Sequence, residues 1–438
     1  MADRRILLVS YLLPPAGGVG VQRPLSLLRY LPELGCRVTA LTVRNPVTGV
    51  YDPALLERIP RETEVLRTWT FEPPHWLRDR LWRKLKRGSS RDVGSESTQR
   101  GIVTRARGWL SQQLERMAIP DPQRAWRPLA TRRAMRLVRS GAIDTVIVSV
   151  PPFSSLQIGV RLKRRFPHLT LISDFRDEWI GWYLAELDPP PSPERVAVSQ
   201  WEERAAIEAS DYVVIVTPAW RDTLRRRYPD QPDGKFICVT NGYEPTAFGG
   251  FQSQFQAGDK LQVVYAGTVY RLSLYSPLRW LEPLDALEES VRSRIHTRLV
   301  GRIEPNVAEM LAQLQGSFET LGFLPHAQAV RHMADADVLL LIAGNSAHLP
   351  GKLFEYLASG KPVVALTPPG GEVAKILDRT QAGFWADIDN PEAIRALARR
   401  LIAWKQNGAP FQPDWEAISS FSRPALVQDF ARKTGLIR

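Results

Sequence analysis

The sequence has few cysteines and no long hydrophobic run. Its 438 residues include two cysteines, Cys36 and Cys238, which lie in or beside predicted strands. This excludes a disulfide framework and a cysteine-based metal site, so both thiols are expected to be reduced core residues. The first apolar run, residues 6–13, is too short to span a bilayer, and no small-residue cleavage site follows it. We therefore expect a cytoplasmic protein.

Acidic residues are outnumbered. The chain has 58 Lys and Arg residues against 46 Asp and Glu residues, a net charge of +12. Such an excess favours polyanionic partners: nucleic acid, an anionic membrane surface or phosphorylated substrates. A basic surface that only keeps the protein soluble is the alternative. Nucleic acid is the weaker interpretation because no recognised binding module appears. No acidic cluster that would hold a divalent ion is evident, so neither a metal nor another cofactor is expected.

Apolar strands alternate with helical patterns along most of the chain. Residues 6–10 are typical of a buried strand in a parallel sheet, and a Pro/Gly loop, a helix at about 22–34 and a strand at 37–43 follow. This order predicts an α/β fold with doubly wound sheets. Further strands are predicted at 145–150, 170–173, 212–216, 236–240, 261–265, 296–300, 318–321, 338–342 and 363–366.

Two halves of similar size are predicted. Residues 1–244 form an N-terminal Rossmann-like domain with an Arg/Trp-rich insertion at about 70–140, and residues 260–410 form a second such domain. The Gly/Gln-rich residues 245–259 fit a linker. The tail, 411–438, is predicted to be helical and to pack back on the N-terminal domain. We expect the strand ends of the two domains to face each other across a ligand-binding cleft.

Two loops follow predicted strands of the first half. The loop at 14–20 contains Gly17 and Gly18, which would let backbone N–H groups approach a phosphate or sugar beside a helix N-terminus. A tight turn without a ligand is the alternative. The second loop, 173–179, places Arg176 and Asp177 at a strand's carboxyl end, where ligands bind in open α/β sheets. An Arg–Asp pair that only pins the loop is the alternative there.

The segment 350–364 predicts a helix between a Pro-Gly loop and an apolar strand. Gly360 ends the helix, and Leu353 belongs to its buried face. Lys352 and Glu355 are three residues apart in the first turn, so both can face one ligand. A helix N-terminus with a lysine suits a diphosphate, and a carboxylate suits ribose hydroxyls. A surface ion pair is the alternative.

Glycines also follow several strands of the second half. Gly267 and Gly301 would allow close approach of a phosphate, and Arg271 could neutralise a diphosphate leaving group. Leu324 lies shortly after another glycine at the end of a predicted strand, at the same edge of the predicted sheet. Candidate donor-binding residues are therefore Gly17, Gly18, Gly267, Arg271, Gly301, Leu324, Lys352, Leu353 and Glu355, and candidate catalytic residues are Arg176, Asp177 and Arg271.

The ordered motifs resemble the GT-B glycosyltransferases of family 4 type. The PPxGGxGxxR loop, Pro-Pro-Phe-Ser-Ser at 151–155, Asp-Phe-Arg-Asp at 174–177, Asn-Gly-Tyr at 241–243, Tyr-Ala-Gly-Thr at 265–268 and the KLFEYLAxGxPV helix span nearly the whole chain. The resemblance is greatest to the bacterial subgroup with a DFRDxW loop. It implies two Rossmann-like domains, of which the first binds an acceptor and the second a nucleotide-sugar donor.

The family resemblance also assigns roles. It implies that Glu355 binds the donor ribose, that Gly17 and Gly18 lie by the donor phosphates and acceptor, and that Arg271 loosely matches a diphosphate-binding arginine. Many members carry a Glu eight residues before the ribose-binding Glu, where this chain has Ala347, followed by His348. Transfer with retention of anomeric configuration and without a metal ion is implied as well.

Residues 75–91 combine basic residues, two tryptophans and a leucine stripe at helical spacing. This pattern favours a helix lying on an anionic membrane, with the protein attached peripherally to the inner face of the plasma membrane. A helix packed on its own domain is the alternative.

Together these patterns predict a hexosyltransferase that moves a sugar from a UDP- or GDP-linked donor to a sugar or lipid-linked acceptor in polysaccharide or glycolipid biosynthesis. A nucleotide-sugar epimerase on the same fold and a non-catalytic nucleotide-binding scaffold subunit are the alternatives; Ala347 favours the scaffold.

Overall fold

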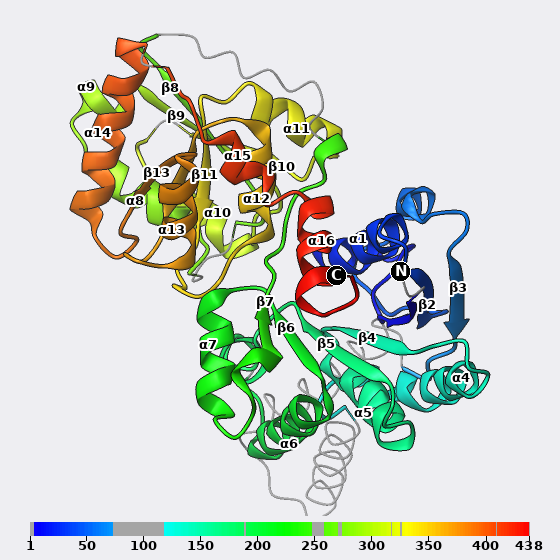
Figure 1. Ribbon diagram of the computed structural model, residues 1–438. Helices are drawn as coiled ribbons and strands as arrows, with labels where there is room; N and C mark the ends of the chain where they lie inside the picture. The colour runs from blue at the N-terminus through cyan, green and yellow to red at the C-terminus, as the bar shows by residue number, and fades with distance from the viewer. Residues whose placement is uncertain are drawn as a thin grey trace, which may run out of the picture. The chain divides into compact units, whose positions relative to one another are not determined.

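The computed structural model (Figure 1) describes residues 4–72, 118–187, 190–247, 258–269, 274–316, 318–324, 326–408 and 410–437. The chain divides into two compact units. The first comprises Met1–Val216, Trp220–Val239 and Val427–Arg438, and the second comprises Thr217–Ala219 and Thr240–Leu426. Within the described ranges, no helix is long and apolar enough to cross a membrane.

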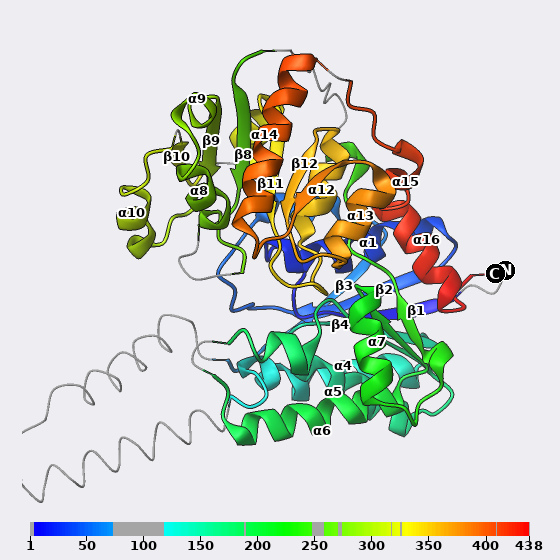
Figure 2. The same ribbon diagram turned by 90° about the vertical axis from the view of Figure 1, so that its left-hand side faces the viewer.

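The first unit is built on a seven-stranded parallel sheet with the strand order β3-β2-β1-β4-β5-β6-β7. Figures 1 and 2 show α4, α5 and α6 on one face of this sheet and α1 on the other. The strands are β1 (Arg5–Val9), β2 (Arg37–Val43), β3 (Glu64–Thr68), β4 (Thr145–Val150), β5 (Thr170–Phe175), β6 (Tyr212–Ile215) and β7 (Phe236–Cys238). The helices are α1 (Val19–Glu33), α4 (Arg127–Arg139), α5 (Leu156–Arg165), α6 (Pro193–Ala209), α7 (Pro218–Arg227) and α16 (Arg423–Lys433).

The second unit has a six-stranded sheet with the order β10-β9-β8-β11-β12-β13. Its strands are β8 (Leu261–Ala266), β9 (Ile295–Val300), β10 (Phe318–Gly322), β11 (Val338–Ile342), β12 (Val363–Leu366) and β13 (Gly383–Ala386). Its helices are α8 (Leu278–Asp285), α9 (Glu289–Arg292), α10 (Pro305–Leu311), α11 (His326–Ala334), α12 (Gly351–Ser359), α13 (Glu372–Thr380), α14 (Pro391–Asn407) and α15 (Trp415–Ser419). All paired strands of this sheet are parallel.

The central strands of the second unit are buried on both faces. In β8, Val263 packs in the core cluster on one side of the sheet and Val264 in the cluster on the other side. Leu340 and Leu341 of β11 alternate in the same way. Successive side chains of a strand point to opposite faces, so a strand covered by helices on both sides must be apolar throughout.

The predicted α/β class and its strands are confirmed, and two edge strands were not predicted. Every predicted strand falls within two residues of its observed position. The edge strands β3 and β13 were missed because their residues are mostly half-buried and give little periodicity. Helix α1 begins at Val19, three residues before the prediction, because the positive φ of Gly18 already turns the chain into it.

Neither cysteine forms a disulfide; Cys36 is buried, as predicted for a core residue, and Cys238 is half-buried. The helical prediction for the tail agrees with α15 and α16. The predicted basic helix at 75–91 lies outside the described residues.

Helix α5 packs closely on the sheet and depends on a glycine. A methyl group at Gly159 would lie 2.8 Å from a Leu171 methyl group and 2.9 Å from a Val148 methyl group. Gly159→Val should therefore lower the free energy of unfolding by about 1–3 kcal/mol through overpacking. Gly234→Val is the matched control, because no atom lies within 4 Å of the position its Cβ would take. Urea unfolding of both variants measures the difference, and equal stabilities would contradict the packing argument.

Candidate functional site

Two glycines meet at the carboxyl edge of the second sheet. Gly267 follows β8 and donates its N–H to Val300 O at 2.7 Å. Gly301 follows β9 with a φ of 147°, and a side chain there would collide with the Gly267 carbonyl. Only glycine combines this backbone conformation with so close an approach. The two predicted glycines therefore lie next to each other. Because neither has a side chain, they leave space at this edge of the sheet.

Helix α12 begins beside this edge. Its inner face consists of Leu353, Phe354 and Leu357, all buried in the core, which confirms the buried position predicted for Leu353. Gly360 ends the helix in the left-handed conformation. The Ala266 N–H donates to the Tyr356 hydroxyl at 3.2 Å, which fastens the helix to the end of β8.

The Lys352 side chain is enclosed between α12 and Gly267. A methyl group at Gly267 would collide with its ammonium nitrogen, which also lies 5.1 Å from the centre of the Tyr265 ring. Burial lowers the pKa of Lys352 to about 8, although Glu355 acts in the opposite direction. The structure gives this ammonium no hydrogen bond or ion pair with any described residue. A half-buried cation at a helix N-terminus is suited to an anion.

Glu355 lies one turn further along α12, half-buried and close enough to raise the pKa of Lys352. The predicted pair therefore faces one region, and the ammonium and the carboxylate offer a positive and a negative contact about one helical turn apart.

The loop before α12 contributes His348. Its ring packs edge-on against Tyr275, with ring centres 5.3 Å apart. Burial lowers the pKa of His348 to about 4, so the imidazole is neutral at pH 7. Ala347 precedes it and donates its N–H to the Asn345 side chain at 2.8 Å.

Sequence reasoning missed a carboxylate beside this loop. Glu372 begins α13 and is 4% exposed; its N–H donates to Ser346 O at 2.8 Å and its carboxylate pairs with Lys375 at 3.0 Å. The signal was present in Pro368-Pro369-Gly370-Gly371, a strand-to-helix loop of the same kind as the other motifs.

The remaining predicted donor residues are placed differently. Leu353 is fully buried, and its N–H donates to Pro350 O at 3.0 Å. Leu324 is half-buried against the core cluster that contains α12. Arg271 lies outside the described residues.

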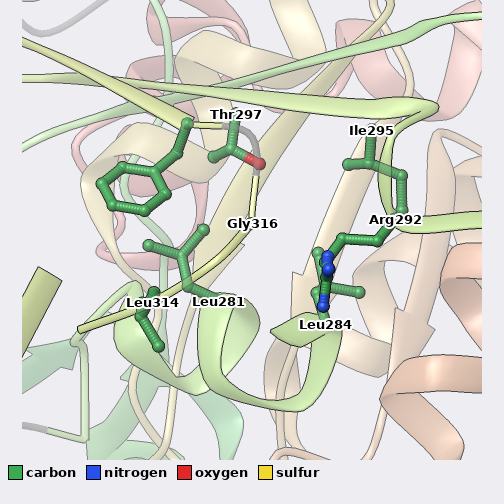
Figure 3. A pocket seen from close by; sticks show the side chains of 8 residues that line it. Leu281, Leu284, Arg292, Ile295, Thr297, Leu314 and Gly316 are labelled. Carbon is green, nitrogen blue, oxygen red and sulfur yellow. The ribbon is translucent and has the colours of Figure 1, made fainter. Parts of the chain in front are cut away.

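An apolar hollow lies elsewhere in this unit (Figure 3). It is lined by Leu281, Leu284 and the first residues of β9 and β10, so it sits at the amino edge of the sheet. Arg292 is its one charged lining residue, and its guanidinium donates a hydrogen bond to the Asp285 carbonyl at 2.9 Å. The chemistry of Lys352 and Glu355 is at the opposite edge, and we assign the hollow no part in it.

In the first unit, the glycine-rich loop lies over Arg176. Gly17 donates its N–H to Val50 O at 3.0 Å, and Gly18, with a φ of 86°, precedes α1. A methyl group at Gly20 would lie 3.2 Å from Arg176 Nη1. The two loops that the sequence pointed to are therefore neighbours.

The Arg176 side chain is 6% exposed. Its Nε donates to Val150 O at 3.0 Å and its Nη2 to Pro151 O, whereas its buried Nη1 has no hydrogen-bond partner among the described residues. Burial lowers the pKa of Arg176 to about 10, while Asp177 and Asp174 oppose the shift. The guanidinium stays charged at pH 7, so the loop has a positive group at the strand end.

Two acids of the same loop have structural partners. Asp174 accepts from Arg23 Nε at 2.8 Å and from Ser149 at 2.8 Å. Glu178 accepts the N–H groups of Gly181 and Trp182, each at 2.6 Å. Glu178 also pairs with Arg227 at 2.6 Å, and Arg227 pairs at 2.7 Å with Glu203, which is fully buried.

Asp177 lies between them and has no hydrogen bond or ion pair with any described residue. Burial raises the pKa of the half-buried Asp177 to about 6, against the attraction of Arg176. Contacts of Arg176 and Glu178 on either side fix the loop backbone, and the Asp177 carboxylate is left available to a hydroxyl group.

A further carboxylate at this edge was not predicted. Asp121 is 8% exposed, accepts the Ser154 N–H at 2.8 Å with one oxygen, and leaves the other oxygen without a partner among the described residues. Burial raises its pKa. The sequence gives little sign of it, because it belongs to a stretch, 70–140, whose composition is dominated by arginine and tryptophan.

No group of His, Cys, Asp and Glu residues suited to a metal ion is found in the part of the chain that the structure describes. The sequence does contain Asp-x-Asp triplets at 335–337 and 387–389. Asp337 in the first triplet pairs with Lys405 at 2.6 Å and accepts the Gln262 N–H at 2.9 Å, which is a structural role.

Residues 260–403 match the family model described as "Glycosyl transferases group 1". This range contains Gly267, Gly301, Lys352 and Glu355. No curated protein matches the chain by sequence.

Solved structures match nearly the whole chain. Sucrose-phosphate synthase from Thermosynechococcus elongatus is 14% identical, with 98% of both chains covered and a TM-score of 0.59. Anabaena HepE in complex with UDP is 15% identical, with 99% of this chain and 100% of that chain covered and a TM-score of 0.57.

The fold is GT-B. A putative UDP-N-acetylglucosamine 2-epimerase from Listeria monocytogenes also matches, at 11% identity, 99% and 97% coverage and a TM-score of 0.52. The GT-B fold therefore leaves the reaction open, and the site residues must decide it.

Replacing the half-buried lysine should affect the stability of the fold and the binding of an anion in opposite directions. Lys352→Met removes a charge that burial disfavours, so the ligand-free protein should become more stable by on the order of 1–3 kcal/mol at pH 7. Its melting temperature should no longer rise with UDP or GDP. Lys260→Met, at an exposed position, is the control and should change neither property. An undiminished nucleotide response in Lys352→Met would refute the anion site.

The raised pKa of Asp177 should make the difference in stability between the wild type and Asp177→Asn depend on pH. Folded Asp177 keeps its proton up to pH about 6, whereas the ordinary value is 3.8. The wild type therefore loses the stability that protonated Asp177 contributes as pH rises from about 4 to about 6, and this contribution is absent from the variant, so the difference between the two proteins changes over this range. Above pH 6 the variant should be more stable by on the order of 1–2 kcal/mol, since solvent screens a half-buried side chain. Urea unfolding across this range measures the difference, and a constant difference at all pH values would contradict the assignment.

Proposed function

We propose that the protein is a glycosyltransferase that moves a sugar from a nucleoside diphosphate sugar to a hydroxyl acceptor. The observation that carries this proposal is Lys352, at the start of α12 and against Gly267. Its half-buried ammonium has no hydrogen bond or ion pair with the residues that the structure describes. The match of residues 260–403 to glycosyl transferases of group 1 supports the same activity.

In the second unit, each donor group has a matching element. The diphosphate lies at the N-terminus of α12, where Lys352 and the helix dipole offset its charge and Gly267 and Gly301 leave room for it. Glu355 accepts hydrogen bonds from the ribose hydroxyls. As the glycosidic bond breaks, negative charge grows on the leaving diphosphate, and Lys352 and Arg271 stabilise it.

In the first unit, Arg176 and Asp177 serve the acceptor and the transferred sugar. Asp177 accepts a hydrogen bond from a hydroxyl group, and its pKa of about 6 allows it to take a proton near neutral pH. Gly17 and Gly18 let the donor phosphates and the acceptor approach the start of α1. We propose that transfer retains the anomeric configuration and needs no metal ion.

The donor is proposed to be UDP- or GDP-linked and to carry a hexose. Anabaena HepE forms a complex with UDP, which favours UDP as the first nucleotide to test. The acceptor is proposed to be a sugar or a lipid-linked sugar in bacterial surface polysaccharide or glycolipid synthesis. Such an acceptor places the protein in the cytoplasm, attached peripherally to the inner face of the membrane, with residues 75–91 as the predicted contact.

Two other functions follow from particular observations. Epimerisation of a nucleotide sugar is favoured by the likeness to the Listeria protein, a putative epimerase. A scaffold that binds nucleotide without catalysis is favoured by Ala347, where a second acid would be expected from the family resemblance.

Thermal unfolding with UDP, GDP, ADP and their sugars tests the donor site. Saturating nucleotide at about 100 times its Kd should stabilise the protein by about 2.7 kcal/mol, and EDTA should not change this. Glu355→Ala should weaken binding by roughly 10–100-fold because charge-assisted hydrogen bonds to the ribose are lost. Glu309→Ala, at an exposed position on α10, is the matched control.

The reaction is tested separately by release of nucleoside diphosphate. Release that depends on an added acceptor supports transfer, and conversion of the donor sugar without an acceptor supports epimerisation. Binding without either reaction supports the scaffold. No response to any nucleotide would overturn the donor site itself.

A further inference from the structure

Helices α4 and α5 lie side by side on one face of the first sheet, with α6 next to α5 (Figures 1 and 2). Every charged side chain in α4 and α5 is a lysine or an arginine; neither helix contains Asp or Glu. This is unusual for surface helices, which normally mix both signs of charge. The excess positive charge of the chain is thus partly gathered on α4 and α5, whereas α6 carries acids as well as arginines.

Two of these cations have structural roles. Arg127 pairs with Glu202 at 2.7 Å, and Lys163 pairs with Asp211 at 2.8 Å. The others form no ion pair with any described residue, and we call them the arginine face. The arginine face consists of Arg132, Arg133, Arg136, Arg139, Arg161, Arg164 and Arg165.

The arginine face points away from the core. Ala130, Ala134 and Val138 of α4 are buried, as are Ile158 and Leu162 of α5, so the intervening arginines stand on the outer side of the layer. Most of them belong to the C-terminal halves of the two helices, where the helix dipole favours cations. The dipole explains why cations are tolerated there, but it does not explain why both helices lack acids.

An exposed tryptophan stands in the same layer. Trp201 of α6 is 61% exposed, although a side chain of this size and apolarity is normally covered. Tryptophan beside arginine is typical of surfaces that rest at the boundary between lipid headgroups and acyl chains. The carboxyl ends of the strands, with Arg176 and Asp177, lie at the other end of α5 and stay uncovered.

We propose that the arginine face, with Trp201, binds an anionic lipid surface. Its charge complements acidic headgroups, and several arginines in one layer can each contact a headgroup without a defined pocket. This docking is separate from the prediction for residues 75–91, and it does not depend on which sugar is transferred. It supplies a second basic contact, as stable attachment of a protein without a spanning helix generally requires more than one membrane-binding element.

Co-sedimentation of the full chain with vesicles tests the proposal. The protein should bind vesicles of phosphatidylcholine mixed with phosphatidylglycerol and not vesicles of phosphatidylcholine alone. Each arginine near such a surface contributes roughly a fivefold change in partitioning, so Arg164→Gln with Arg165→Gln should weaken binding by about 25-fold. Arg132→Gln with Arg136→Gln should weaken it by a similar factor.

The matched control is Arg399→Gln with Arg400→Gln, an adjacent pair of exposed arginines on α14 of the second unit. It changes the net charge equally and should leave vesicle binding within about twofold of the wild type. All variants should keep the melting-temperature response to UDP or GDP found for the wild type, which separates this test from that of the donor site.

Three outcomes would overturn the proposal. One is that the α5 variant and the α14 control lose vesicle binding equally, which would indicate a nonspecific effect of net charge. Another is that vesicle binding is lost only when Lys84 and Lys86 of the predicted 75–91 contact are replaced by glutamine, and not in the variants of the arginine face. The third is binding of RNA at low salt without any binding to anionic vesicles.

Discussion

The burial of a lysine ammonium against a glycine is the constraint on which the second unit's site depends. Lys352 can occupy its position only because Gly267 has no side chain and because Tyr356 holds α12 to the end of β8. Burying its charge costs free energy, which the lowered pKa expresses. Natural proteins retain such a cost where a ligand offsets it, so the cost itself points to the chemistry of that ligand.

In the first unit, the acids of the loop after β5 differ in whether they have partners. Three carboxylates fall within five residues of one loop, but two of them are committed to structure: Asp174 to Arg23, and Glu178 to backbone amides and Arg227. Asp177 alone among the three has no hydrogen bond or ion pair with a described residue. Of the three acids that the sequence places close together, Asp177 was the predicted candidate, and the other two are anchored by partners far away in the chain.

The sequence predicted most of the fold because the central strands, such as β1, β4, β11 and β12, are almost entirely buried and appear as mostly apolar runs. It failed at β3 and β13, whose residues are mostly half-buried and show little periodicity. Motifs at strand ends predicted Lys352 and Glu355 in the second unit and Asp177 in the first, since the loops after the parallel strands of one sheet lie at the same edge of that sheet. Asp121 was missed because its burial and its long-range neighbour, Ser154, are not encoded by a local pattern. Glu372 was missed although a Pro/Gly loop precedes it, because its burial and its contact with Ser346 become visible only in the fold.

The route of the chain has a consequence for its synthesis. Arg23 in the first helix donates to Val239 O, and Lys433 in the last helix donates to Cys238 O at 3.0 Å. Residues Val427–Arg438 belong to the first unit, although the whole of the second unit is translated before them. On the ribosome, the unit that begins first must therefore wait for residues 427–438 to emerge, and the second unit can complete its fold earlier. A chain cut short near its end would leave the N-terminal unit, not the C-terminal one, unfinished.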